Sequence, residues 1–169
     1  MANKKYMLKP VLGTIKESFT LVDENETLIY ECRMNKFSLF GAAPYTFTNH
    51  ITNKVEEHKV GKTVTTQESG MVSMFSTSSS FKYDGEKIWD YLHQKGIRIN
   101  SNISDSKIGM TYDISLEGKP LATIATSSPK GKSFITTDKY YEVNCDEQDL
   151  DLVFLVAFAI AKTEQTFYN

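Results

Sequence analysis

The chain has 169 residues, of which 24% are charged, and its formal net charge is −2. A chain of this length fits one domain, which buries about 70% of the surface that its unfolded chain exposes. The small net charge argues against a general nucleic-acid binder, and the N-terminus carries lysines without an apolar segment, which argues against a secretory signal. We therefore expect a single domain over residues 1–169, located in the cytoplasm.

The first half of the chain predicts antiparallel β-structure. From Tyr6 onward, short runs of alternating or β-branched residues are separated by polar turns. The clearest hairpin has strands at Ser18–Val22 and Thr27–Cys32, joined by the polar turn Asp23–Glu26. Further strands are expected at Phe37–Phe40, Tyr45–Asn49, within the polar segment 51–70, and at Met71–Phe75 and Phe81–Tyr83.

The Ser/Thr-rich segment 76–80 allows two interpretations. Such a run can be a flexible linker between domains. We favour a loop or an edge strand, because neither flanking part is long enough for a sizeable core of its own.

A change of period after Asp84-Gly85 predicts a short amphipathic helix at Glu86–Lys95. Ile88, Trp89 and Leu92 fall on one helical face, and Gly96 stands where a left-handed residue commonly ends a helix. We expect this helix to pack on the outside of the sheet. Trp89, the only tryptophan, is then its anchor rather than a residue that stacks on a ligand.

The second half returns to β-structure before its last helix. Its hairpin, Thr111–Leu116 and Leu121–Thr126 around the turn Glu117–Pro120, has the same order of alternating run, turn and apolar run as the first hairpin, which suggests two halves built alike. The other strands expected here are Ile97–Asn100, Ser133–Thr136 and Tyr140–Val143.

The segment Leu152–Ala161 is the most informative part of the chain. It contains no charged residue, glycine or proline, and as a helix it would be apolar on every side. Such a helix must be surrounded by lipid or by protein, and a bilayer span needs about 18 apolar residues, more than this segment supplies. It is therefore predicted to be a helix buried in its own protein.

Acidic residues precede this helix. Asp146 is a candidate N-cap, Glu147, Asp149 and Asp151 add negative charge to the first turns, and Lys162 follows the apolar run. A metal site is the alternative interpretation. We favour capping, because no histidine or further carboxylate lies nearby in the sequence to complete a hard-cation site.

Many short strands before one fully apolar helix predict the architecture. About ten or more strands are expected, and the simplest structure that hides such a helix is a sheet curled into a closed barrel around it, which also removes the sheet edges. The predicted fold is mainly β (α+β): a closed antiparallel β-barrel around Leu150–Ala161 with one outer helix at Glu86–Lys95.

Three segments carry a resemblance to a known family: Leu21–Glu31, Tyr112–Ile124 and Tyr140–Ile160, the last with a strand, an acidic turn and the apolar helix. In these the chain resembles the tubby C-terminal-like superfamily, which includes the LURP-one-related proteins and the phospholipid scramblases. The resemblance covers nearly the whole chain and implies a barrel of about twelve strands threaded by a hydrophobic helix. Asp84–Arg98, with its helix, looks like a small bacterial branch of the superfamily.

The resemblance also implies lipid recognition, at the level of the fold alone. The cations with which tubby contacts phosphoinositides have no residue-by-residue match in this chain. The cysteine-rich palmitoylation segment and the membrane span of the scramblases are absent from the sequence, which counts against scramblase activity.

Two short motifs contain the end of a P-loop, Gly61–Thr63 and Gly131–Ser133. A P-loop also needs a glycine five residues earlier, so that its backbone can wrap around phosphates. Glu56 and Thr126 occupy those positions, so both motifs are predicted to be turns.

Catalytic and metal chemistry have little support in the sequence. His58, with Glu56 and Glu57 beside it, could be a base with an orienting carboxylate, but a solvated strand face is favoured. Cys32 and Cys145 have no sequence-level partner and are expected as small apolar residues in strands. We predict no catalytic residue, no metal site and no cofactor.

Lysines are the best candidates for binding an anion. Lys119, Lys130 and Lys132 are the predicted ligand-binding residues, and Lys4, Lys5, Lys9 and Lys16 form a second group. Each lysine close to an anionic bilayer contributes about 1 kcal/mol, so convergent lysines would matter and dispersed ones would not. The net charge of −2 favours dispersed, solubilising lysines.

Three classes of function remain. A non-catalytic binding module for anionic lipid or a phosphorylated ligand requires Lys119, Lys130 and Lys132 to converge, and it would place the protein peripherally at a membrane. A protein-interaction or regulatory domain requires an exposed aromatic patch, for example at Phe37, Phe40 and Tyr45. An enzyme requires a pocket with a histidine and carboxylates in hydrogen-bond reach. The first is preferred, so the expected partners are an anionic membrane lipid or another protein.

Overall fold

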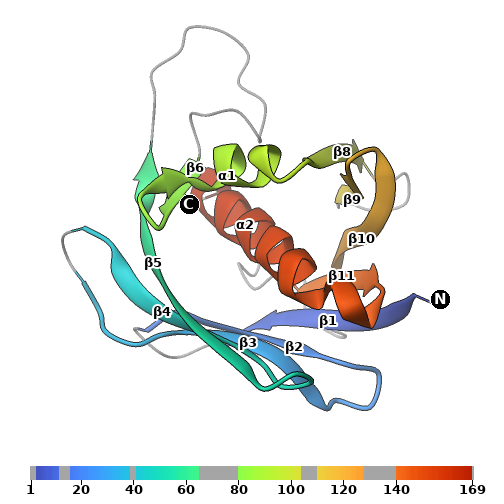
Figure 1. Cartoon of the computed structure of the whole chain (residues 1–169), viewed down its shortest axis with the longest axis horizontal. Coiled ribbons are helices and arrows are strands. Elements are labelled where there is room, and N and C mark those ends of the chain that lie inside the picture. The colour runs from blue at the N-terminus through green and yellow to red at the C-terminus, as the bar shows by residue number, and fades with distance from the viewer. Residues whose placement is uncertain are drawn as a thin grey trace, which may run out of the picture.

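The computed structural model describes residues 3–11, 16–38, 41–64, 80–103, 110–127 and 140–168. These residues form one eleven-stranded antiparallel sheet and two α-helices (Figure 1). The elements are β1 (Lys4–Pro10), β2 (Ser18–Val22), β3 (Leu28–Met34), β4 (Ala43–Asn49), β5 (Lys54–Val64), β6 (Ser80–Tyr83), β7 (Glu86–Lys87), α1 (Ile88–Gln94), β8 (Ile97–Ile103), β9 (Met110–Leu116), β10 (Lys119–Ser127), β11 (Tyr140–Cys145) and α2 (Leu150–Tyr168).

The two halves of the chain join in the middle of the sheet. The strand order is β7-β6-β5-β4-β3-β2-β1-β11-β10-β9-β8, so the first and last strands are neighbours. Lys4 pairs with Cys145 and Leu8 with Tyr141. Figure 1 shows the sheet curling around α2, with α1 and β6 on the side opposite β1–β4. The mainly antiparallel β-structure around a C-terminal helix is therefore confirmed.

The prediction of a closed barrel is wrong, because the edge strands β7 and β8 do not pair with each other. β7 has only two residues before the chain turns into α1 at Ile88, so too little strand remains to form a ladder with β8. α1 joins these two edges and contacts β6, β7, β8 and α2. It thus fills a gap in the sheet rather than lying outside it, and Trp89 anchors it by donating from Nε1 to Thr163 Oγ1 of α2 at 3.3 Å.

The core is centred on α2, as its sequence predicts. From Val153 to Ala161 every residue is buried. Phe154 stacks on Tyr30 with ring centroids 4.2 Å apart. Phe158 lies at the centre of an aromatic cluster, with centroid distances of 5.5 to 5.9 Å to Phe19, Tyr45, Phe47 and Phe81. These rings come from inward-facing positions of the strands. Because every second residue of a strand points to the same face, each strand can direct a row of side chains at the apolar helix.

The predicted helix boundaries are confirmed in part. Asp146 accepts a hydrogen bond from the Gln148 amide, but it caps a 3₁₀ turn, Glu147–Asp149, that leads into α2. Gly96 has φ +92°, the left-handed conformation expected after α1, where glycine carries no Cβ penalty. Of the helices in the described residues, neither combines the length and apolarity that crossing a bilayer requires.

Some strand and turn predictions are wrong or lie outside the described residues. β3 ends at Met34 and residues 37–38 are irregular, so no strand begins at Phe37. Gly61–Thr63 lies inside β5 and is not a turn. The predicted elements Met71–Phe75 and Ser133–Thr136, and the second P-loop fragment, lie outside the described residues.

Both cysteines occupy strands, as predicted. Cys32 lies on β3 and Cys145 on β11, both are buried, and both are free thiols. Two strands, β2 and β1, separate β3 from β11 in the sheet, so these thiols belong to different parts of the core. Burial raises the pKa of Cys145 to about 12, which keeps its thiol protonated and unreactive.

Replacement of Phe154 or Phe158 by Ala tests whether α2 is the core. Each side chain is at most 1% exposed. We expect each substitution to lower the free energy of unfolding by about 3–5 kcal/mol, because it leaves a cavity among aromatic rings. Urea unfolding followed by circular dichroism measures the change.

The matched control is Val55→Ala, at a side chain that is 62% exposed. It should change the free energy of unfolding by less than about 0.5 kcal/mol. A loss below about 1 kcal/mol at both phenylalanines would mean that α2 is peripheral.

Candidate functional site

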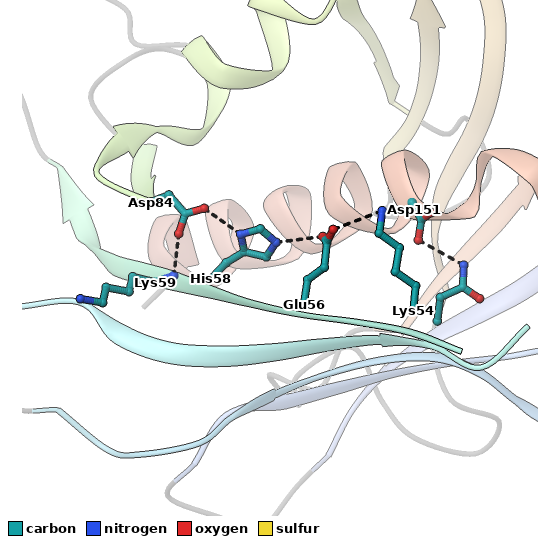
Figure 2. Close-up of polar contacts among 7 residues, drawn as sticks. Lys54, Glu56, His58, Lys59, Asp84 and Asp151 are labelled. Atoms are coloured by element: carbon teal, nitrogen blue, oxygen red, sulfur yellow. Dashed lines mark hydrogen bonds and ion pairs between the residues drawn. The ribbon is translucent and has the colours of Figure 1, made fainter. Parts of the chain in front are cut away.

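Strand β5 carries charged residues where its neighbour carries core residues. Lys54 pairs with Asn49 and His58 with Tyr45 across the β4–β5 ladder. Directly opposed residues of an antiparallel pair share a face of the sheet, and Asn49 and Tyr45 are buried. Figure 2 shows the side chains of Lys54, Glu56 and His58 extending from β5 toward α2. We call these three residues, together with Asn49, Asp84 and Asp151, the β5 cluster.

His58 is held between two carboxylates. Its Nδ1 lies 2.7 Å from Asp84 Oδ2, and its Nε2 lies 3.1 Å from Glu56 Oε2 (Figure 2). The imidazole ring also contacts the Tyr83 ring at a centroid distance of 4.7 Å and the edge of Phe47 at 5.5 Å. The side chain is 21% exposed, so most of the ring is shielded from water.

Asp84 comes from the hairpin turn between β6 and β7. Asp84 and Gly85 have φ +51° and +85°, which is the type I′ pattern of an Asp-Gly hairpin turn. The Asp84 amide donates to the Lys59 carbonyl at 2.7 Å, and Asp84 Oδ1 accepts from the Lys59 amide at 2.8 Å. These two hydrogen bonds to the backbone of β5 therefore position the Asp84 carboxylate next to His58.

The cluster continues to the first turn of α2. Lys54 Nζ lies 3.2 Å from Glu56 Oε1 and 3.9 Å from Asp151 Oδ2. Asn49, 3% exposed, donates from Nδ2 to Asp151 Oδ1 at 3.1 Å. Its Oδ1 accepts from the amides of Ile51 and Thr52 in the β4–β5 turn. One polar chain thus links the β6–β7 turn, β5, β4 and α2.

The charges in the cluster favour its ionised forms. The pKa of Glu56 is lowered, chiefly because His58 donates a hydrogen bond to its carboxylate. The pKa of Lys54 is raised, chiefly by its hydrogen bond to Glu56. Burial raises the pKa of Tyr30, and the nearby Asp151 carboxylate raises it further. The phenol of Tyr30 is therefore neutral next to the charged end of the cluster.

This arrangement has limited chemical capacity. Each nitrogen of His58 faces a carboxylate, so neither offers a free lone pair to a substrate proton or a metal ion. Within the described residues, no group of three or more His, Cys, Asp or Glu side chains could hold a metal ion. The cluster suits electrostatic cross-linking of elements better than proton transfer.

The sequence favours a solvated strand face for His58 and gives pairing with Glu56 or Glu57 only as the alternative. The structure shows the pairing with Glu56, while Glu57 lies on the other face because alternate residues of a strand point in opposite directions. Asp84 was missed because it is 26 residues away in the chain. In the sequence, Asp84-Gly85 indicates only the point where a helix begins, and the β5–β6 register is what brings Asp84 to His58.

The predicted ligand-binding lysines are described in part. Lys119 is exposed at the first position of β10, after the β9–β10 turn. Lys130 and Lys132 lie outside the described residues, so the convergence of the three side chains stays a prediction. They follow Ser127, which stands at the far end of β10 from Lys119.

Three N-terminal lysines are paired with acids. Lys4 Nζ lies 2.6 Å from Glu147, Lys9 Nζ 2.8 Å from Glu26 and Lys5 Nζ 3.6 Å from Glu142. Lys4 and Lys5 also line a shallow groove beside the start of α2, where Asp23, Glu24 and Glu147 supply negative charge. This surface has mixed charge and is not a basic face.

Comparison of the chain with protein-family models, with curated proteins and with solved structures gives no match.

Asn49→Asp tests whether the buried end of the cluster stabilises the fold. The new carboxylate keeps the acceptor for the β4–β5 turn but lies beside the Asp151 carboxylate. We expect the free energy of unfolding to fall by about 1–3 kcal/mol at neutral pH. The amide group that donates to Asp151 is replaced by a carboxylate, which repels it. Part of the loss should be recovered near pH 4, where carboxylates take up protons.

Urea unfolding at the two pH values measures this difference. Asn35→Asp is the control for the same chemical change at an exposed residue. Its amide donates to the Thr46 hydroxyl, which can instead donate to the new carboxylate, so the change should cost less than about 0.5 kcal/mol. An Asn49→Asp variant as stable as the parent at neutral pH would show that the Asn49–Asp151 contact contributes nothing.

Proposed function

We propose that this protein is a non-catalytic binding module that takes an anionic lipid headgroup or another phosphorylated ligand at a face containing Lys119, Lys130 and Lys132. The observation that carries the proposal is the contrast among the lysines. Within the described residues Lys119 is exposed and has no ion-pair partner, whereas Lys4, Lys5 and Lys9 each have a carboxylate partner. A lysine without an internal counter-ion keeps its charge available to an anion.

The resemblance to the tubby-like superfamily supports a lipid as the source of that anion, at the level of fold alone. A sheet curled around a hydrophobic C-terminal helix agrees with the general plan of that family. The open edge between β7 and β8 departs from the family's closed barrel.

The other two classes of function have weaker support. The aromatic patch of a protein-interaction domain loses one predicted member, because Tyr45 is 2% exposed and donates from its OH to Glu17. Phe37 is 47% exposed, and Phe40 lies outside the described residues. The enzyme class required a pocket with a histidine and carboxylates in hydrogen-bond reach. His58 has carboxylates in reach, but they occupy both of its nitrogens.

Co-sedimentation with vesicles tests the proposed function. Neutral, anionic and phosphoinositide-doped vesicles are compared at low and moderate salt. We expect binding to the charged vesicles that weakens as salt screens the lysines. Double replacement Lys130→Glu and Lys132→Glu should weaken binding at least tenfold, because each lysine contributes about 1 kcal/mol near an anionic surface. Lys119→Glu should also weaken binding to the charged vesicles.

Lys59→Glu is the matched control, because Lys59 is exposed and its side chain is directed away from the β5 cluster in Figure 2. It should bind vesicles like the parent chain. Competition by inorganic phosphate distinguishes a free phosphorylated ligand from a lipid surface. An absence of binding to every vesicle and to phosphate would remove the proposal.

A further inference from the structure

His58 makes two contacts that only its charged form can satisfy together. A neutral imidazole carries one N–H, so it can donate to Asp84 or to Glu56 but not to both. The other nitrogen would then direct its lone pair at a carboxylate within 3.1 Å, which is repulsive. A protonated ring donates from both nitrogens at the observed distances of 2.7 and 3.1 Å.

These contacts fasten a weakly connected part of the sheet. β5 pairs with β6 at Val60, Thr63 and Val64, with an irregularity between Val60 and Thr63. Towards Lys54, β5 has no ladder partner on that edge within the described residues, and the link continues through Asp84 to Lys59 and His58. The chain runs from this turn directly into β7 and α1, which join the two edges of the sheet.

The surroundings of the ring contain few other charges. From β5, Glu56 faces His58, and Lys54 reaches Glu56 from the other side. From β6 and its turn come Tyr83 and Asp84, and Tyr83 is in turn packed on Tyr91 of α1. From β4 the ring meets the uncharged Phe47, and the other β4 neighbour, Tyr45, turns its OH to Glu17. From α2, Asp151 acts through Lys54.

We propose that Glu56, His58 and Asp84 form a proton-dependent clasp that holds the β6–β7 turn on β5 when His58 is charged and loosens it when the ring is neutral. Histidine side chains ordinarily change charge between about pH 5 and 8, so pH is the variable with which the clasp is tested. Its effect is local, because the clasp joins one turn to one strand while Trp89 still anchors α1 on α2.

The two partners of the clasp give opposite signs of pH dependence. Glu56 has a lowered pKa in the folded chain, so its contribution is present above the unfolded-state pKa and is lost as pH falls through the folded-state value. The two contacts of His58 need a proton on each ring nitrogen, so they cannot both persist where the ring is neutral. The clasp is therefore strongest at mildly acidic pH.

Amide hydrogen exchange at Lys59 and Asp84 tests the clasp, because both amides bond across this junction. Exchange rates divided by the intrinsic rate are compared at about pH 5.5 and pH 8.5. We expect protection of both amides to fall on the order of threefold between these values, the effect of one partly exposed charge pair. Nitrogen-15 spectra of His58 should show two protonated ring nitrogens at the lower pH.

Glu56→Gln and Glu57→Gln are a matched pair of variants. An amide at position 56 can accept from an N–H or donate to a lone pair, so it suits either form of the ring and should reduce the pH dependence to the part that comes from the His58–Asp84 pair. Glu57, next in the chain and exposed, lies on the other face, so Glu57→Gln should retain the pH dependence in full.

His50→Gln controls for a second histidine, since His50 lies 3.6 Å from Glu31 and away from the clasp. It should leave protection of Lys59 and Asp84 unchanged. Three results would each overturn the proposal: equal protection of the parent chain at both pH values, loss of the pH dependence in Glu57→Gln as in Glu56→Gln, or a singly protonated His58 at the lower pH.

Discussion

The structure depends on the burial of one helix that has no polar side. Over Val153–Ala161, α2 offers apolar side chains in every direction, so a layer on one face cannot cover it. A sheet has to curl around it, and pairing of the first and last strands, β1 and β11, makes the curled sheet continuous between the two halves of the chain. α1 covers a side that strands leave open, with Ile88 and Leu92 fully buried.

The β5 cluster lies where the apolar contacts around α2 give way to polar residues. Inward positions on β4 hold Tyr45 and Phe47, which meet Phe158, while the positions opposite them on β5 hold His58 and Glu56. At 21% and 46% side-chain exposure, these two polar side chains are partly accessible to water. Charges so near a core are stable only if they are paired, and each charged member of the cluster has an opposite charge within 4 Å.

Local patterns were enough to predict the parts of the fold that depend on neighbouring residues. The apolar run of α2, the Asp23–Glu26 hairpin turn and Gly96 after α1 could be recognised because propensity, period and capping act over a few residues. The open edge could not be predicted, because closure depends on the register of strands far apart in sequence and on the shortness of β7. For the same reason, the contact of Asp84 with His58 could not be predicted. The choice of Glu56 rather than Glu57 as the partner of His58 could have been predicted, because alternate residues of a strand share a face.

Two kinds of contact hold the sheet around α2. One kind is buried and aromatic, and the other, to which the proposed clasp belongs, is polar and partly exposed. Around Phe158 the contacts are aromatic, dry and made by β2, β4 and β6, so opening them would require loss of the core. Between β5 and the β6–β7 turn, the contacts are hydrogen bonds and partly exposed ion pairs, together with the packing of the His58 ring on Tyr83. Local opening of a protein begins where apolar contacts are few and polar contacts are exposed to water. We therefore expect the β6–β7 turn to open more readily than the aromatic core, so that loosening of the proposed clasp leaves the core in place.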